Sequence, residues 1–204
     1  MTARWPDGRG VSRETLERLT IYVDLIRKWN PRINLVSRNS LEHVWDRHIA
    51  DSLQIFALAP EFSHWVDIGS GGGLPGLVAA ICGAEEMPEA RFTLIESDQR
   101  KCAFLRTVAR EAGISVTVHA QRIEEAAPQE ADVLSARALA DLSQLLEFAE
   151  RHVAKSGICL FPKGASWKKE LADARTQWRF DCDAVTSKTE PQAAILKIQG
   201  VSCG

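Results

Sequence analysis

Apolar residues recur at three- and four-residue steps near the amino terminus, the spacing that places side chains on one face of an α-helix. In the first such segment these positions are Leu16, Leu19, Val23, Ile26 and Trp29. Ser12 can cap this helix, and Pro31 is expected to stop it. A second apolar face runs from Leu41 to Leu58 and is followed by Pro60. Residues 1–60 are therefore predicted to form a helical extension.

Beyond residue 60, short apolar runs alternate with helical patterns. The predicted strands are 65–69, 91–97, 115–120, 131–136, 157–164, 179–185 and 193–199, and the predicted helices start at Pro75 or span 98–112, 142–153 and 167–177. This alternation is typical of a parallel sheet with helices on both faces, and the last two strands, which lack a helix between them, are expected to form an antiparallel edge. The prediction is an α/β, Rossmann-like fold with a seven-stranded, mostly parallel sheet, in which residues 61–204 form the core of one compact domain.

Composition narrows the class of protein further. The chain has 204 residues and a formal charge of −2, with no overall excess of basic residues that would indicate nucleic acid. The five cysteines include no CxxC pair and no histidine lies at metal-ligand spacing, so neither a disulfide framework nor a metal site is expected. There is no apolar run long enough to span a membrane and no signal-like core in the first ten residues. We expect a cytoplasmic protein without a membrane partner.

The stretch VDIGSGGGLPG, residues 66–76, follows the first predicted strand. Gly69, Gly71 and Gly73 allow a tight turn, and a nucleotide-type ligand can approach their bare backbone. About twenty residues further on, the second strand ends in Glu96, where a carboxylate can accept hydrogen bonds from both ribose hydroxyls of an adenosine. The glycine turn and this acid together predict an adenosine-containing cofactor.

Two classes of cofactor remain at this point. Gly71, Gly73 and Gly76 match G-x-G-x-x-G, so an NAD(P)-dependent oxidoreductase or a flavin enzyme is an alternative. Against it, the only tyrosine lies upstream of the loop, and no length remains for a separate substrate domain. Asp67, two residues before the first glycine, and the antiparallel edge look like the seven-stranded methyltransferase architecture. We therefore favour S-adenosyl-L-methionine as the cofactor, with S-adenosyl-L-homocysteine as the product.

The sequence signatures that this chain lacks narrow the class of methyl acceptor. Methylation of a pyrimidine carbon needs a nucleophilic cysteine, usually beside a proline, and no cysteine here has one. Methylation of an exocyclic amine commonly uses a polar-Pro-Pro-aromatic loop after the fourth strand, where this chain has residues 135–138, SARA. An acceptor with an in-plane lone pair, such as guanine N7, loses no proton and needs only alignment.

Several sequence blocks together resemble the RsmG (GidB) family of bacterial 16S ribosomal RNA guanine-N7 methyltransferases. They are KWN at 28–30, RHIADSL at 47–53, DIGSGGGLPG at 67–76, KCAFL at 101–105, RIEE at 122–125, SARAL at 135–139 and KG at 163–164. The resemblance covers nearly the whole chain. It implies transfer of a methyl group from S-adenosylmethionine to N7 of one guanine in 16S rRNA of the small ribosomal subunit.

The resemblance also implies a set of site residues. The methyl donor is expected against Gly69, Leu74, Glu96, Ile123, Glu124 and Arg137, with Asp67, Gly71 and Gly73 completing the cofactor-binding loop. The catalytic candidates are Arg137, Lys163 and His48. Arg137 would meet the donor carboxylate or an RNA phosphate, and Lys163 a phosphate or the carbonyl edge of the base. His48 shares a helix face with Asp51, which would hold the imidazole over the cofactor, but it is not assigned as a base.

RNA contact is expected from local basic residues. These are Arg27, Lys28, Arg32 and Arg38, with Lys163, Lys168 and Lys169 from the other end of the chain. Because this cluster is small, the 16S rRNA is expected to be recognised within the small subunit or an assembly intermediate, and no obligate protein partner is inferred. A non-catalytic ribosome-associated module that only binds the cofactor is a further alternative.

Overall fold

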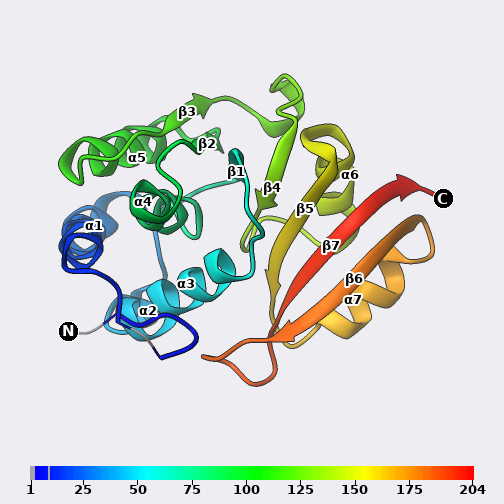
Figure 1. Ribbon diagram of the computed structural model, residues 1–204, viewed down its shortest axis with the longest axis horizontal. Helices are drawn as coiled ribbons and strands as arrows, with labels where there is room; N and C mark the ends of the chain where they lie inside the picture. Colours follow the sequence, from blue (N-terminus) through cyan, green and yellow to red (C-terminus); the bar gives the residue numbers. More distant parts are fainter. Residues whose placement is uncertain (1–2, 9) are drawn as a thin grey trace.

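Seven strands form one sheet in the order β3-β2-β1-β4-β5-β7-β6 (Figure 1). This arrangement is seen in a computed structural model, which describes residues 3–8 and 10–204. The strands are β1 His64–Ile68, β2 Arg91–Glu96, β3 Thr117–Ala120, β4 Ala131–Ser135, β5 Val153–Lys163, β6 Trp178–Thr186 and β7 Ala194–Cys203. β1 to β5 are parallel, whereas β7 is antiparallel to both β5 and β6. The predicted mostly parallel sheet with an antiparallel edge is confirmed.

Helices cover both faces of the sheet (Figure 1). They are α1 Arg13–Ile33, α2 Arg38–Leu41, a π-helix η1 Val44–Ile49, α3 Ala50–Ala57, α4 Gly76–Glu86, α5 Gln99–Glu111, a short 3₁₀ turn η2 Ile123–Glu125, α6 Leu142–His152 and α7 Trp167–Ala174. Buried residues of α1, α3, α4 and α5 form one apolar cluster, and those of α6 join a second cluster with the other side of the sheet. The central strands are therefore buried on both faces, as strands of parallel sheets usually are, whereas the edge strand β6 has no buried residue.

The first helix begins as predicted but ends later. The Ser12 side chain accepts a hydrogen bond from the Thr15 backbone N–H at 3.0 Å, which caps α1. The prediction that Pro31 stops the helix is wrong, because α1 continues to Ile33. Pro31 lies in the last turn, where its missing backbone donor and its ring disturb only the end of the helix. The helix ends where Asn34 adopts a left-handed conformation with φ 50°.

The second predicted helix, over residues 41–58, is not a single α-helix. A short α2 is followed by the π-helical segment η1 and then by α3. The wider π-turn shifts the side chains that follow relative to the regular helix period, and such turns are frequent at functional sites. In η1, Val44 and Ile49 are buried while Arg47 and His48 line a cavity. An apolar period of 3.6 gives no sign of this shift.

The helical extension packs directly on the glycine turn. The hydroxyl of the buried Tyr22 in α1 donates a hydrogen bond to the Gly72 backbone carbonyl at 2.6 Å. Asn30 accepts backbone hydrogen bonds from Leu35 and Val36 at 2.7 and 2.8 Å, which fixes the link between α1 and α2. The domain boundary at residue 60 stays a prediction. Among the described residues, no helix is both long and apolar enough to cross a membrane.

Several other predicted boundaries differ from the structure, and β7 continues to Cys203, four residues beyond the predicted strand. β5 starts at Val153, four residues before the predicted strand, and directly follows α6. β3 starts at Thr117 and α7 ends at Ala174, so both are shorter than predicted. Local pattern places such ends poorly, because the pairing of neighbouring strands decides how far each one extends.

Candidate active site

The glycine turn between β1 and α4 has the backbone conformation that its glycines suggested. Gly69, Gly71 and Gly73 have φ angles of 60°, 55° and 86°, which side-chain-bearing residues rarely adopt. A Cβ on Gly69 would also lie 2.5 Å from Cδ1 of Leu139. The turn is held by the Gly73 N–H, which donates to the Ser70 carbonyl at 2.7 Å. This turn therefore presents bare, rigid backbone toward the carboxyl ends of the strands.

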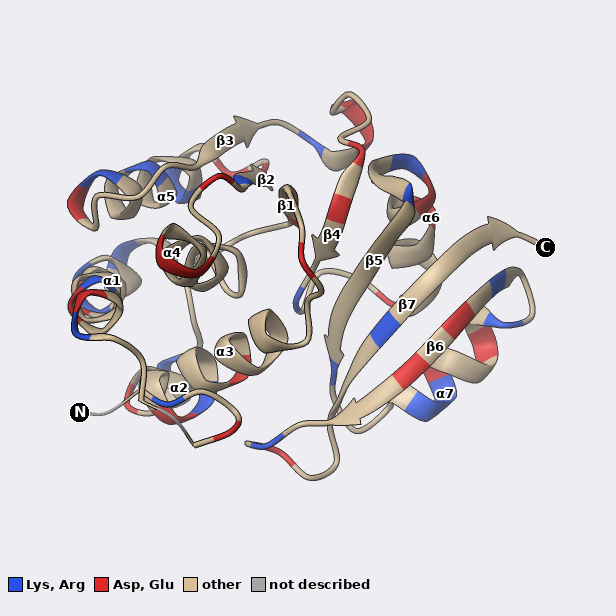
Figure 2. Cartoon of the chain, viewed as in Figure 1, with Lys and Arg blue, Asp and Glu red and all other residues tan. Residues whose placement is uncertain are grey.

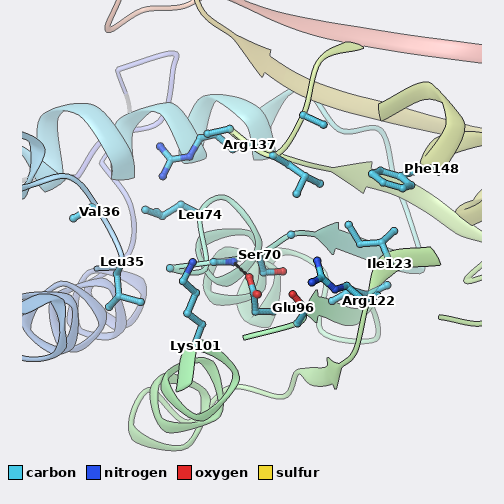
Figure 3. A pocket seen from close by; sticks show the side chains of 18 of the residues that line it. Leu35, Val36, Ser70, Leu74, Glu96, Lys101, Arg122, Ile123, Arg137 and Phe148 are labelled. Carbon is cyan, nitrogen blue, oxygen red and sulfur yellow. Dashed lines mark hydrogen bonds between the residues drawn. The ribbon is translucent and has the colours of Figure 1, made fainter. Parts of the chain in front are cut away.

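A cavity of about 740 Å³ opens at this end of the sheet (Figure 3). It lies where the strand order reverses between β1 and β4, the place where open α/β sheets bind ligands. The predicted site residues that line it are Gly69, Gly71, Leu74, Glu96, Ile123, Glu124, Arg137 and His48. Asp67, Gly73 and Lys163 are not among the lining residues. The fold thus brings together eight of the eleven predicted positions.

Glu96 is fixed at the end of β2 by two backbone donors. Its Oε2 atom accepts a hydrogen bond from the Gly71 N–H at 2.8 Å, and its Oε1 atom accepts one from the Asp98 N–H at 2.8 Å. The side chain is buried except for 8% of its surface. Each carboxylate oxygen has a further lone pair. Glu96 can therefore still accept two hydrogen bonds from a ligand in the cavity.

Asp67 lies beneath the turn rather than in the cavity. Its Oδ1 atom accepts a hydrogen bond from the Ser135 hydroxyl at 2.6 Å, and the Ser135 hydroxyl in turn accepts one from the indole of Trp65 at 2.9 Å. Burial raises the pKa of Asp67 to about 6, although the hydrogen bonds from Ser135 and Ser70 act in the opposite direction. This carboxyl joins β1 to β4 and supports the turn from below.

Arg137 follows β4 and meets His48 from η1. An Nη1–H of Arg137 donates to Nδ1 of His48 at 2.8 Å, so the imidazole must be neutral at that nitrogen. Burial, together with the positive charges of Arg137 and Arg47, lowers the pKa of His48 to about 4. The predicted partner of the imidazole was Asp51, and the structure places Arg137 there instead. Among the described residues, no carboxylate forms an ion pair with Arg137, so its guanidinium is available for an anionic ligand.

Lys163 has a different environment from the one its position at a strand end suggested. Its ammonium group donates to the Ala140 carbonyl at 2.7 Å and forms an ion pair with Glu170 of α7 at 2.8 Å. Only 8% of the Lys163 side chain is exposed. It lines a second cavity, next to the first, which Arg137 also lines. Contact between Lys163 and an RNA ligand stays a prediction.

Several lining residues were not predicted. Leu35, Val36, Lys101, Arg122 and Phe148 are among them. Lys101 and Arg122 belong to the KCAFL and RIEE sequence blocks. These blocks indicated the region of the site but did not indicate that the two side chains line it. Phe148 projects from α6 toward Ile123 (Figure 3). No local signal distinguishes it from the other apolar residues of that helix.

Comparison with known proteins identifies the family. A family described as GidB, rRNA small subunit methyltransferase G, matches residues 15–196. The chain belongs to this family. Ribosomal RNA small subunit methyltransferase G of Ruegeria sp. (strain TM1040) is 62% identical over 200 residues, which cover 96% of this chain and 98% of the relative. The protein of the same name from Ruegeria pomeroyi is 64% identical over 94% of each chain.

Solved structures agree with the fold. A TehB-like SAM-dependent methyltransferase from Corynebacterium glutamicum has a TM-score of 0.58 at 15% identity and covers 89% of this chain and 98% of its own. The mitomycin 7-O-methyltransferase MmcR has a TM-score of 0.58 at 14% identity, over 92% of this chain and 68% of its own. The predicted family, the methyltransferase activity and the Rossmann-like methyltransferase fold are confirmed. The roles of the individual site residues stay predictions.

Proposed function

We propose that this chain transfers the methyl group of S-adenosylmethionine to N7 of one guanine in 16S rRNA. The supporting observation is the cavity at the reversal of strand order, where a bare glycine turn, the oriented Glu96 carboxylate and the Arg137 guanidinium, which forms no ion pair among the described residues, face one ligand space. Membership of the rRNA small subunit methyltransferase G family supports RNA as the substrate. The nitrogen acceptor is favoured because, among the described residues, no cysteine lines the cavity, and because residues 135–138, SARA, are not an amine-methylating loop.

The lining residues match the chemical groups of the methyl donor. Glu96 accepts hydrogen bonds from the two ribose hydroxyls, using the lone pairs that Gly71 and Asp98 leave open. Ile123 and Phe148 offer apolar surface for the adenine ring. Arg137 binds the donor carboxylate, because a half-buried guanidinium without an ion pair favours an anion.

S-adenosylmethionine supplies an electrophilic methyl group on a sulfonium. The protein supplies alignment: the glycine turn and Glu96 fix the adenosine end of the donor, while Arg137 fixes its amino acid end. Guanine N7 carries its lone pair in the ring plane and loses no proton on methylation, so the reaction needs no general base. The neutral His48 accordingly acts by holding Arg137 through Nδ1. His48 is a positioning residue in this proposal.

The RNA is recognised as part of a folded particle. Basic and acidic residues are interspersed along α1 and α7 rather than gathered on one face (Figure 2). Affinity for naked RNA depends mainly on the number of phosphates that basic residues neutralise. A surface of mixed charge therefore favours recognition of shape, as supplied by the small ribosomal subunit or an assembly intermediate in the cytoplasm.

The test is methyl transfer from radiolabelled S-adenosylmethionine to small subunits that lack the modification, followed by mapping of the labelled nucleotide. We expect label in one guanine of 16S rRNA, in a form that behaves as 7-methylguanine. Label in protein or in another base would contradict the proposed acceptor. Binding of the donor without transfer would instead support the cofactor-binding module, and binding of NADH alone would support an oxidoreductase.

A further inference from the structure

A second cavity, of about 400 Å³, adjoins the first at the carboxyl ends of β4 and β5. The two cavities have Arg47, Arg137, Ala138 and Ala140 in common, so the shared wall is the segment that follows β4 together with η1. Ala138 in this wall has a φ of 53°, a strained conformation for a residue with a side chain. Arg137 thus faces both the proposed donor site and the neighbouring space.

Asp51 of α3 lines this second cavity and is held in place from the opposite end of the sequence. The hydroxyl of Thr189 donates to its Oδ1 atom. One turn of α3 later, the Gln54 side chain donates to the Thr186 carbonyl at 2.9 Å and accepts from the Lys188 N–H at 2.9 Å. These bonds fasten α3 to the connection between β6 and β7. The carboxylate therefore has a fixed direction.

The negative charge of Asp51 is not neutralised by an ion pair within the described residues. Burial raises the pKa of Asp51, while the hydrogen bonds from Thr189 and Ser187 and the charges of Arg137 and Arg47 lower it. In the part of the chain that the structure describes, no lysine or arginine forms an ion pair with it. The two hydroxyl donors, Thr189 and Ser187, leave further lone pairs of this oriented, half-buried carboxylate able to accept hydrogen bonds from a ligand.

We infer that the second cavity receives the guanine base to be methylated, and that Asp51 accepts hydrogen bonds from guanine N1–H and from the 2-amino group. This inference rests on the proposed function. Guanine has the acceptors O6 and N7 on one edge and two donors on another. The cavity is lined by the cations of Arg47, Arg137 and Lys163 and by the carboxylates of Asp51, Glu170 and Glu190. Glu170 is paired with Lys163, which leaves Arg137 and Asp51 to face a base between them. Adenine has no N1–H and no 2-amino group, so Asp51 would reject it.

The same carboxylate favours the reaction itself. As guanine N7 gains the methyl carbon, the carbon–sulfur bond breaks and its electron pair stays on sulfur, so one positive charge passes from sulfur to the guanine ring. No proton moves in this step. A ring that becomes cationic donates more strongly through N1–H and the 2-amino group. Asp51 consequently binds the transition state more tightly than the neutral base, which raises kcat.

The first test replaces Asp51 by asparagine, which retains an oxygen to accept from Thr189 but loses the charge. With unmodified small subunits and radiolabelled donor, Asp51→Asn is expected to lower kcat at least about tenfold, the effect of losing charge-assisted hydrogen bonds. Its affinity for S-adenosylmethionine and its melting temperature should stay close to those of the unchanged protein. Asp46→Asn, at an exposed acid of η1, is the matched control and should keep full activity.

The second test asks whether Asp51 touches the base. Subunits are rebuilt with inosine, which lacks only the 2-amino group, in place of the methylated guanosine. The unchanged enzyme should lose several-fold in rate on inosine, and Asp51→Asn should lose nothing further. If the asparagine variant folds poorly, Thr189→Val takes its place, because it removes the hydrogen bond that orients the carboxylate but keeps the carboxylate. Its loss of kcat should lie between those of the unchanged protein and of Asp51→Asn.

The outcomes separate the two proposals. If the unchanged enzyme does not label the guanosine subunits, the proposed function fails and this inference falls with it. If the enzyme is active but Asp51→Asn matches it, only the inference is overturned. An equal inosine penalty in both enzymes would mean that Asp51 is structural and does not contact the base, which would also overturn it.

Discussion

Replacement of Glu96 by alanine tests the proposed donor site most directly. Both oxygens of Glu96 are oriented by backbone N–H groups at 2.8 Å, which leaves two lone pairs for the ribose hydroxyls. Alanine removes both proposed hydrogen bonds to the ligand. A hydrogen bond to a charged group contributes about 1.5 to 3 kcal/mol, so the loss of two is about 3 kcal/mol at the lower limit. That loss corresponds to roughly a 100-fold rise in Kd, since about 1.4 kcal/mol is tenfold.

The assay is calorimetric titration with S-adenosylmethionine and with S-adenosylhomocysteine, accompanied by thermal unfolding of each variant. Glu89→Ala, an exposed acid that precedes β2, is the matched control and should bind both ligands normally. Both compounds carry the same ribose, so Glu96→Ala should weaken them equally. A Kd within twofold of the unchanged protein would refute the placement of the ribose against Glu96. Weakening of only one ligand would show that the carboxylate contacts a different part of the donor.

Three further predictions concern stability and pH. The folded pKa of His48, about 4, lies below its ordinary value of 6.5, so the unfolded chain alone takes up this proton as the pH falls from 6.5 toward 4. Measured by urea unfolding, the free energy of unfolding of the unchanged protein should fall relative to that of His48→Gln over this pH range. If the difference between the two free energies does not change with pH, the imidazole is not buried in its neutral form. Lys163→Met should lower the free energy of unfolding by about 2 to 4 kcal/mol, because it leaves Glu170 without its cation. The double variant Lys163→Met with Glu170→Leu should recover much of that loss. If the losses of the two single variants simply add in the double variant, the two residues are not a coupled pair. Gly76→Ala should destabilise the fold by about 2 kcal/mol or more, because the added Cβ lies 2.5 Å from Leu94 and 2.7 Å from Asp67. At Gly164 an added Cβ meets nothing within 4 Å, so Gly164→Ala is the control and should be neutral. Equal melting temperatures of the two variants would refute the close packing around Gly76.

Local pattern was sufficient for much of the architecture. Strands such as β1 and β2 are short segments rich in aromatic and β-branched residues, and α5 begins at the capping Asp98 and ends beside Gly113. The glycine turn was predictable because positive φ angles leave few alternatives to glycine. The same reasoning failed in η1, where the hydrogen-bond period itself changes while the apolar residues still suggest an ordinary helix.

The sequence by itself determined the mostly parallel sheet with its antiparallel edge, the glycine turn and the acid at the end of β2, because each depends on patterns of residues close together in the chain. Only the tertiary structure decided that Arg137 meets His48, that Asp67 supports the turn from beneath, and that Lys163 pairs with Glu170. These contacts join residues that are far apart along the chain, with the exception of the last pair. The separation of two residues in the sequence does not tell how far apart their side chains lie in the fold. Their burial and their pKa values depend on which elements the sheet brings together.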